Sequence, residues 1–339
     1  MLTPDLSVIV PVYNEEEGLP ALFTRLYASL DALQLLYEVV FVNDGSRDRS
    51  AALLREQFQK RPEVTRVILF NGNFGQHMAI MAGFAHARGR RVVTLDADLQ
   101  NPPEEIGKLM AAMDEGHDYV GTIRRDRQDS ALRRYASRFM NRLRERITRV
   151  RMTDQGCMLR AYSRDIVDAM ASSREVNTYI PALAYTYAAN PTEIKVAHEE
   201  RAAGQSKYSY YQLLRLNFDL ITGFSVVPLQ MYSILGFLVS LVSVGFFAVI
   251  IYRRFAYGSE AEGLFTLFAI AFLLLGVALF GIGMLGEYVG RIYQQVRERP
   301  RYLIQAILET DEQQQVTTER AKPATQPASR SSMLTRDSR

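Results

Sequence analysis

Two aspartates at the end of an apolar run are the residues of this chain that point most directly to chemistry. Residues 91–106 read RVVTLDADLQNPPEEI, in which a run typical of a buried strand passes directly into Asp96 and Asp98. Two carboxylates so close together repel each other and resist removal from water. A divalent cation would remove that repulsion, and Mg²⁺ typically takes one or two carboxylates together with phosphate oxygens of a substrate. The pair therefore predicts a site for a metal ion and a phosphorylated ligand, whereas a solvated turn is the simpler alternative.

A regular alternation of strands and helices surrounds this pair. Short apolar runs have the length of strands, and amphipathic segments of helical length separate them. Strands are expected over 6–13, 37–44, 64–70 and 91–98, and helices over 15–33, 50–60 and 76–87. This pattern predicts an α/β fold with a mostly parallel sheet and helices on both faces.

Polar residues gather where the expected strands end. They are Asn14 and Glu15, Asn43 and Asp44, Asn71 and Asn73, and Asp96 and Asp98. In open parallel sheets, ligands bind beyond the carboxyl ends of the strands, so these side chains are expected to share one edge. A G-x-G-x-x-G fingerprint is absent, which argues against a nicotinamide-dependent dehydrogenase.

Two long stretches without a charged side chain, residues 220–252 and 263–286, follow the α/β part. Each exceeds the roughly 20 residues that a membrane span needs, so transmembrane helices are expected at 227–252 and 264–287. A buried hairpin of a soluble protein is the alternative, although soluble helices of that length usually carry a polar stripe. Basic residues flank the pair and place the main domain in the cytoplasm by the positive-inside rule, against two arginines in the loop.

The whole chain of 339 residues divides around these spans. The expected parts are a cytoplasmic α/β domain at 1–205, an interfacial helix at 206–226, a periplasmic loop at 253–263, a cytoplasmic juxtamembrane segment at 288–308 and a disordered tail at 309–339. A single cysteine, Cys157, excludes an intrachain disulfide and favours a reducing compartment. The net charge of only +3 gives no reason to expect nucleic acid as a partner.

Residues 131–150, ALRRYASRFMNRLRERITRV, form a basic amphipathic pattern. Apolar residues recur on one helical face, arginines cover much of the rest, and Glu145 is the only acid in the stretch. Helices of this kind lie on anionic lipid surfaces, whereas an ordinary solvated face would mix the two signs. The stretch therefore predicts contact with membrane lipids.

Several motifs together resemble the family 2 inverting glycosyltransferases, which have a GT-A (Rossmann-like) fold. They are VIVPVYNEE at 8–16, VNDGSRD at 42–48, NFGQHMAIMAGFAHARG at 73–89 and LDADLQNPPE at 95–104. The two C-terminal spans narrow the resemblance, which covers about residues 5–305, to the polyprenyl-phosphate glycosyltransferases. That group contains dolichyl-phosphate mannose synthase and the bacterial lipid-linked glucosyltransferases.

The resemblance implies a reaction and its partners. A UDP-sugar would be the donor, undecaprenyl phosphate the acceptor and Mg²⁺ or Mn²⁺ the cofactor, in a multi-pass protein of the bacterial inner membrane that forms a homo-oligomer, a tetramer by family. Further motifs are most similar to the branch that transfers 4-deoxy-4-formamido-L-arabinose, for lipid A modification and polymyxin resistance. They are GTIRRDRQDS at 121–130, DQGCMLRAYSRDIVDAM at 154–170, GQSKYS at 204–209 and GMLGEYVGRIY at 283–293.

The resemblance also implies roles for individual residues. Those of the donor site would be Pro11, Tyr13, Glu15 and Asp44 at the uridine, Asp96 and Ala97 near the ribose, and Asp98 and Gln100 at the metal and diphosphate. Arg201 and Lys207, in the RAAGQSKY loop, would stabilise charge on the diphosphate. Those of the acceptor phosphate would be Arg124, Arg127, Arg133 and Ser137. Asp154 matches the candidate base or acceptor-orienting residue; Asn, Asp and Ser at strand ends are alternatively good helix N-caps.

Other functions remain open on these residues. A polyprenyl-phosphate glucose or mannose synthase would share every motif. A processive polysaccharide synthase would carry Q-x-x-R-W, and this chain has no tryptophan. A non-catalytic nucleotide-sugar-binding membrane scaffold is a rival of another class, although it would not need Asp98, Asp154 and the basic loop together. The four histidines lack the spacing of a zinc site, and Cys157 is expected to pack in the core.

Overall fold

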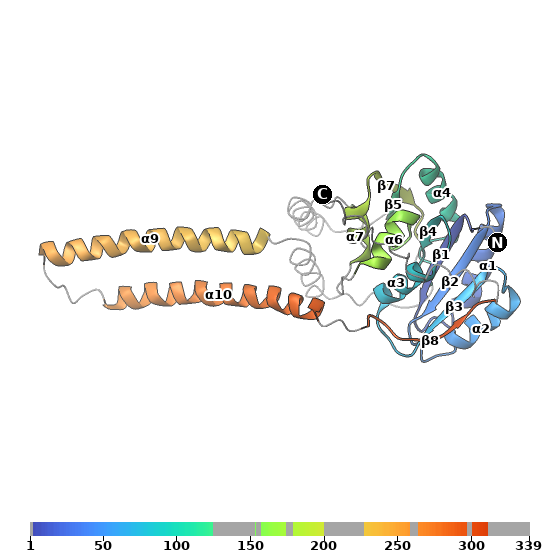
Figure 1. Ribbon diagram of the computed structural model, residues 1–339, viewed down its shortest axis with the longest axis horizontal. Coiled ribbons are helices and arrows are strands. Elements are labelled where there is room, and N and C mark those ends of the chain that lie inside the picture. The colour runs from blue at the N-terminus through green and yellow to red at the C-terminus, as the bar shows by residue number, and fades with distance from the viewer. Residues whose placement is uncertain are drawn as a thin grey trace, which may run out of the picture.

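The computed structural model has two parts, an α/β domain and a hairpin of two long helices that runs away from it (Figure 1). It describes residues 3–124, 153, 157–173, 179–199, 227–257, 264–296 and 300–310. The stretches expected as interfacial helices, 131–150 and 206–226, lie outside the described residues.

A mixed eight-stranded sheet with the order β7-β5-β6-β4-β1-β2-β3-β8 forms the centre of the α/β domain. Its strands are β1 (Leu6–Val12), β2 (Tyr37–Asn43), β3 (Thr65–Phe70), β4 (Arg91–Thr94), β5 (Tyr119–Arg124), β6 (Arg160–Ser163), β7 (Pro191–Val196) and β8 (Ile304–Leu308). The first four strands are parallel, as predicted, whereas β6 and β8 run against their neighbours. The mostly parallel sheet is thus confirmed.

Helices cover both faces of the sheet, which confirms the second part of the prediction. They are α1 (Leu19–Ala32), α2 (Ser50–Lys60), α3 (Gln76–His86), the short η1 (Pro103–Glu105), α4 (Ile106–Asp114), α6 (Arg164–Ser172) and α7 (Ile180–Tyr187). Alternate residues of β1 point to opposite faces. Val8 and Val10 belong to the core beneath α1, α2 and α4, and Ile9 to the core beneath α3, α6 and α7.

β4 ends earlier than the sequence predicts. The strand was expected to reach Asp98 but stops at Thr94, and the Leu95 N–H makes a final bond of 3.0 Å to the carbonyl of Ile9. Beyond this point Leu99 has a positive φ of 59°, and the Gln100 N–H donates to Asp98 Oδ1 at 3.1 Å. The chain leaves the ladder because this tight turn folds the Asp96–Asp98 loop over the end of the sheet.

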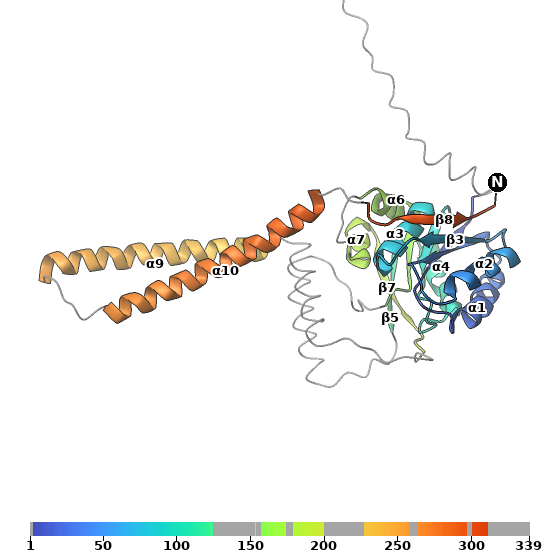
Figure 2. The same cartoon turned by 90° about the horizontal axis from the view of Figure 1, so that it is seen from below.

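The segment after the second long helix returns to the sheet as β8, which the sequence did not indicate as a strand. β8 pairs antiparallel with β3 (Figure 2), and the ring of Tyr302 stacks on Phe70 with centroids 5.0 Å apart. Because the pairing is antiparallel, the first residue of β8, Ile304, lies beside Phe70 at the carboxyl end of β3. The chain therefore enters the α/β domain from the hairpin at the carboxyl edge of the sheet.

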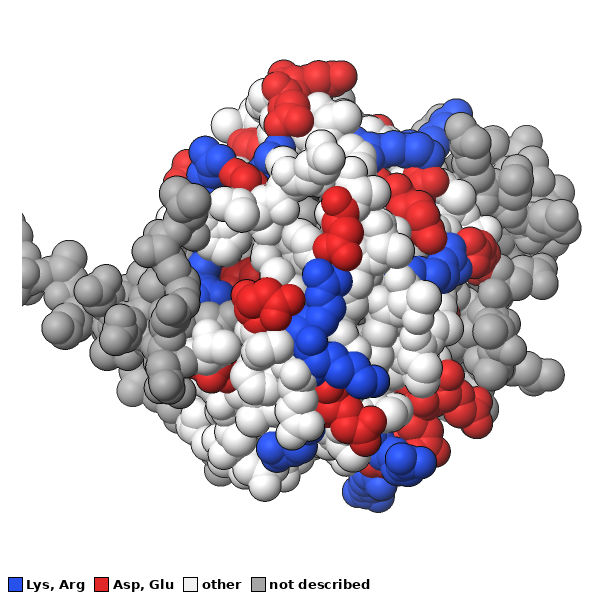
Figure 3. Space-filling view, turned by 90° about the vertical axis from the view of Figure 1, so that its right-hand side faces the viewer, with Lys and Arg blue, Asp and Glu red and all other residues white. Residues whose placement is uncertain are grey.

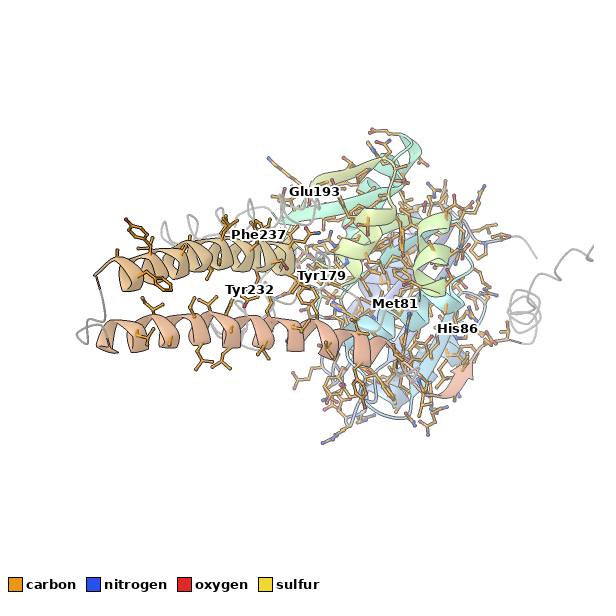
Figure 4. The ribbon with its side chains drawn as sticks, turned by 60° about the vertical axis from the view of Figure 1, so that its left-hand side comes forward. Met81, His86, Tyr179, Glu193, Tyr232 and Phe237 are labelled. Carbon is orange, nitrogen blue, oxygen red and sulfur yellow. The ribbon has the colours of Figure 1, made fainter. Side chains whose placement is uncertain are left out.

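The hairpin consists of α9 (Val227–Tyr257) and α10 (Leu264–Val296). The helices begin where the spans were expected and continue beyond the expected ends, residues 252 and 287. Tyr232 lies between them (Figure 4), and its hydroxyl donates to the carbonyl of Val277 at 2.9 Å. Gly281 permits this contact, since a Cβ there would lie 1.9 Å from the Tyr232 ring. Counted over the described residues, no helix is long and apolar enough to cross a membrane.

Candidate functional site

The carboxyl ends of β1 to β4 bring the predicted polar residues to one edge of the sheet. β2 and β3 follow β1 on one side, while β4 pairs with β1 on the other. The order of the strands therefore reverses between β1 and β4. Open α/β sheets bind ligands at such a switch point, so the loops that follow these two strands are the place to look for a site.

Hydrogen bonds from backbone N–H groups to side-chain oxygens join the loops after β1 and β2. The Asn14 N–H donates to Ser46 Oγ at 3.0 Å, and Asn14 Oδ1 accepts the Arg47 N–H at 2.9 Å. The Glu15 N–H donates to Ser50 Oγ, at the first turn of α2, at 3.0 Å. Ser50 and Asn14 thus have structural roles, and they fix the loop that carries Tyr13 and Glu15.

Pro11, in β1, and Tyr13, directly after it, differ in how much of the side chain is exposed. Pro11 is buried beside Val42 in the β1–β2 pairing, whereas Tyr13, directly after the strand, is 43% exposed. Proline has no N–H for a ladder bond, and Pro11 lies beyond the last residue pair that β1 makes with β4, Ile9 with Thr94. The strand can therefore end here with an aromatic ring presented to the edge.

Asp44 holds the loop that follows β3. Its two carboxylate oxygens accept the N–H groups of Phe74 at 2.7 Å and Gly75 at 2.9 Å. Burial raises the pKa of the Asp44 carboxyl, and these two N–H donors oppose the rise. Gly45, with φ of 66°, allows the loops to meet, since a Cβ there would lie 2.4 Å from the carbonyl carbon of Gly72. Each Asp44 oxygen keeps a second lone pair with which to meet a ligand.

The Asp96–Asp98 loop lies against the starts of α1 and α3. Asp96 Oδ1 accepts the side-chain N–H of Gln76, the first residue of α3, at 2.6 Å. A Cβ built on Gly18 would lie 3.7 Å from both the Ala97 carbonyl oxygen and Glu15 Oε2, so both groups border Gly18, just before α1. Gln76 was not predicted as a site residue, although it stands in the NFGQHM motif.

The donor set of this edge fits a divalent cation that shares its ligands with a substrate. In the described part of the chain, no group of three or more His, Cys, Asp or Glu side chains could hold a metal. Asp96 and Asp98 instead offer carboxylate oxygens from one half-buried loop. Mg²⁺ and Mn²⁺ prefer such oxygen donors, and the positions that the protein leaves open would suit phosphate oxygens and water.

The structure describes only a few of the residues predicted for the acceptor phosphate and the basic loop. The predicted site residues that lie outside the described residues are Arg127, Arg133, Ser137, Asp154, Arg201 and Lys207. The backbone of Arg124 ends β5 at the same carboxyl edge as the donor candidates. The Glu199 N–H, two residues before Arg201, donates to the carbonyl of Gln100 at 2.9 Å. Glu199, the last described residue before that loop, therefore lies beside the candidate metal loop.

The surface that faces away from the hairpin mixes both signs of charge. Among the described residues of that face, Lys and Arg side chains lie next to Asp and Glu side chains (Figure 3). Ion pairs of the α/β domain include Arg25 with Glu104 at 3.0 Å and Arg61 with Asp31 at 3.1 Å. That face has no broad basic field in its described part.

Two half-buried histidines of α3 should make stability depend on pH. Burial lowers the pKa of His77 and of His86, and the Arg66 charge adds to the effect on His86. The unfolded chain then binds protons below about pH 6.5 that the folded chain does not, so stability is complete above that pH and falls as the pH is lowered. We expect a loss of up to about 1.4 kcal/mol per pH unit for each histidine, measured by urea unfolding between pH 7.5 and 5.5.

A double variant isolates this effect. His77→Gln/His86→Gln should flatten the pH dependence of the free energy of unfolding. An unaltered slope in the double variant would assign the pH dependence to other groups.

Known proteins resemble this chain over most of its length. The model of "Glycosyl transferase family 2" matches residues 7–170. The chain is 48% identical over 309 residues to an undecaprenyl-phosphate 4-deoxy-4-formamido-L-arabinose transferase of Klebsiella pneumoniae, covering 91% of this chain and 94% of that protein. It is 49% identical to the transferase of the same name from Edwardsiella ictaluri, covering 91% and 97%. Glucosyl-3-phosphoglycerate synthase of Mycobacterium tuberculosis is a solved structure with 15% identity and a TM-score of 0.44, covering 65% and 78%.

Proposed function

The chain belongs to glycosyl transferase family 2, together with the two transferases just compared, and we propose that it moves 4-deoxy-4-formamido-L-arabinose from UDP to undecaprenyl phosphate. It is a glycosyltransferase with a GT-A-like fold, a mostly parallel mixed sheet covered by helices. The observation that carries the choice of sugar and lipid is near 50% identity over 91% of the chain, which extends beyond the α/β domain. Lipid A modification and resistance to cationic peptides such as polymyxin would follow from that product.

The donor would bind at the switch point between β1 and β4. Pro11, Tyr13, Glu15 and Asp44 are proposed for the uridine, Asp96 and Ala97 for the ribose. Glu15 Oε2 and the Ala97 carbonyl both border Gly18, which supports one site for the uridine and the ribose. Asp44 would use the lone pairs that the Phe74 and Gly75 N–H groups leave free.

Asp98 and Gln100 are proposed to hold Mg²⁺ or Mn²⁺ beside the diphosphate. When bound, the ion would neutralise charge that develops on the departing UDP. The turn that ties the Gln100 N–H to Asp98 supports this assignment, because it fixes the candidate ligands in one rigid loop. Arg201 and Lys207 would add positive charge from the loop that begins near Gln100.

The acceptor phosphate would attack C1 of the sugar from the face opposite to UDP, which inverts the configuration. Its phosphate would be held by Arg124, Arg127, Arg133 and Ser137, since guanidinium groups grip phosphate with paired donors. A phosphate monoester with a second pKa of about 6 is already largely ionised at neutral pH. Asp154 would therefore orient the acceptor or take a residual proton rather than act as an obligatory strong base.

Although no helix qualifies as a span over the described residues alone, the whole sequence has no charged side chain at 220–252 or 263–286, and we also propose that residues 227–252 and 264–287 cross the bacterial inner membrane. The α/β domain would then lie in the cytoplasm, and a short loop in the periplasm. Large apolar side chains stand exposed along both helices, among them Phe237 at 66% (Figure 4) and Phe280 at 65%. The entry of the chain at the carboxyl edge, beside Phe70, supports an orientation in which the donor site faces the lipid. The oligomer, a tetramer by family, is part of the same proposal.

The deciding experiment measures sugar transfer by the purified full chain in detergent. Undecaprenyl phosphate, Mg²⁺ or Mn²⁺ and a panel of labelled UDP-sugars are supplied, and labelled lipid is separated from released UDP. Label from the 4-formamido-arabinose donor alone supports the proposal. Label from UDP-glucose would reassign the protein as a glucose synthase, and no label from any donor would favour a nucleotide-sugar-binding scaffold.

A further inference from the structure

The side chain of Gln76 joins the start of α3 to the loop that follows β4. Its Nε2–H donates to Asp96 Oδ1 at 2.6 Å, across 20 residues of sequence. Gln76 is the first residue of α3, and Asp96 lies two residues beyond the end of β4. A bond from an N–H to an ionised carboxylate is roughly twice as strong as one between neutral groups. The contact therefore holds the Asp96 carboxylate from an element outside its own loop.

A second carboxylate of the donor edge fixes the backbone directly before Gln76. Asp44 accepts the N–H groups of Phe74 at 2.7 Å and Gly75 at 2.9 Å. Gly75 has a φ of 96°, which L side chains rarely adopt, and from there the chain turns into α3. These three consecutive residues thus contact both carboxylates, Asp44 through the backbone and Asp96 through a side chain.

The helix behind Gln76 gives it a rigid base. Ala79 and Phe84 of α3 are fully buried in the core on that face of the sheet. A Cβ built on Gly83 would lie 2.4 Å from Ile9 Cγ2, so α3 lies directly on β1. Packed interiors yield little to compression. The start of α3 is therefore fixed by the core, and the amide of Gln76 reaches Asp96 from a fixed point.

The contact itself lies at the surface of the donor edge. Gln76 is exposed and Asp96 is half-buried, so both groups can bond to water when the contact is removed. Exchange of such a bond for one to water costs little folding stability. The orientation of a carboxylate that meets a ligand matters more, because a hydrogen bond weakens steeply when its angle is poor.

We propose that Gln76 is a positioning residue for the nucleotide, which holds the Asp96 carboxylate in the orientation that accepts a ribose hydroxyl. Gln76 thereby lets the site prefer a ribonucleotide to its deoxy analogue, since a group placed to bond a hydroxyl is left unpaired when that hydroxyl is missing. This proposal rests on the function proposed above, in which Asp96 binds the ribose of the UDP-sugar.

The role predicts a loss of binding rather than of rate. The diphosphate separates the ribose from C1 of the sugar, so contacts to the ribose are the same before and during transfer. Interactions that are equal in the ground and transition states change KM and leave kcat unaltered. We expect Gln76→Leu, which removes the donor at similar size, to raise the KM of the UDP-sugar about 10-fold with kcat within about twofold.

Equilibrium binding to the full chain in detergent tests the contact directly. UDP, 2′-deoxy-UDP and 3′-deoxy-UDP are compared in the presence of Mn²⁺. The wild type should bind UDP more tightly than the analogue that lacks the hydroxyl accepted by Asp96. Gln76→Leu should raise the Kd of UDP about 10-fold and that of this analogue less than about twofold, so that the preference is lost.

Two further variants separate this role from a general effect on the fold. Gln59→Leu alters a matched exposed glutamine of α2 and should leave all three Kd values within about twofold of wild type. In an Asp96→Ala background, Gln76→Leu should cause no further change, since it acts through that carboxylate. Equal losses for UDP and both analogues, or a full additional loss in the Asp96→Ala background, would overturn the proposal. A wild type that binds all three nucleotides equally would overturn it too.

UDP binding needs neither acceptor nor turnover, which keeps the two proposals distinguishable. If the wild type prefers UDP, Gln76→Leu loses that preference and no sugar is transferred, the proposed function fails and the role of Gln76 stands. If sugar is transferred and Gln76→Leu keeps the preference of the wild type, the role of Gln76 alone is wrong.

Discussion

Asp98→Ala is expected to lower sugar transfer by about three orders of magnitude, which corresponds to about 4 kcal/mol of lost transition-state stabilisation. Asp98 lies half-buried in the turn after β4, where its Oδ1 accepts the Gln100 N–H. Removal of the carboxylate would take away both a proposed metal ligand and the bond that shapes the loop. The measurement is kcat at saturating donor, acceptor and Mn²⁺, with circular dichroism to establish that the domain is folded.

Asp98→Asn and a distant carboxylate supply the comparisons for this result. The asparagine keeps one oxygen and the turn, so it should fall between Asp98→Ala and wild type, and extra metal should not restore it fully. Asp114→Ala removes an exposed partner of Arg91, at the amino end of β4, and should leave kcat within twofold. Full turnover in Asp98→Ala would show that the diphosphate is not held through this carboxylate.

The donor edge was predictable because its signals are local. Each of the first strands is a contiguous apolar run that ends in polar residues, and the alternation with helices fixes a parallel order in which those ends coincide. The placement of Asp44, Asp96 and Asp98 at one edge needed no knowledge of the remaining strands. The sequence predicts a longer β4 because residues 95–98 continue the apolar–polar alternation, whereas the strand ends at Thr94 and the last ladder bond comes from the Leu95 N–H.

The other half of the sheet could not be predicted in this way. β6 has only four residues and starts with Arg160, which reads as a polar surface position but is fully buried. β8 pairs with β3 although more than 200 residues of sequence separate them, and no local sequence pattern indicates that pairing. Glu193 and Thr153 meet for the same kind of reason, through the pairing of β7 with β5. Such contacts are properties of the tertiary fold.

Glu38 also makes contacts that depend on the tertiary fold, and they should matter most for stability. Glu38→Ala is expected to lower the free energy of unfolding by about 3–5 kcal/mol. Its carboxylate is 1% exposed and accepts the backbone N–H of Arg88 at 2.6 Å and the Arg88 Nη2–H at 2.7 Å. The Ser7 hydroxyl donates to it at 2.6 Å, and Arg66 Nη1 lies at 3.7 Å. Alanine would leave Arg88 and Arg66 buried with too little negative charge, and buried unpaired charge is among the costliest defects in a core.

Two matched variants make the prediction specific. Glu63→Ala removes the exposed partner of Arg61, 3.6 Å away, and should change stability by less than about 1 kcal/mol. Glu309→Ala should have an intermediate effect, because Arg66 would keep Glu38 and the His86 carbonyl as partners, while the β3–β8 ladder would lose only the added Arg66–Glu309 ion pair. Urea unfolding of the full chain in detergent measures all three. A loss for Glu38→Ala no larger than that for Glu63→Ala would mean that the amino end of the sheet relaxes enough to hydrate both arginines.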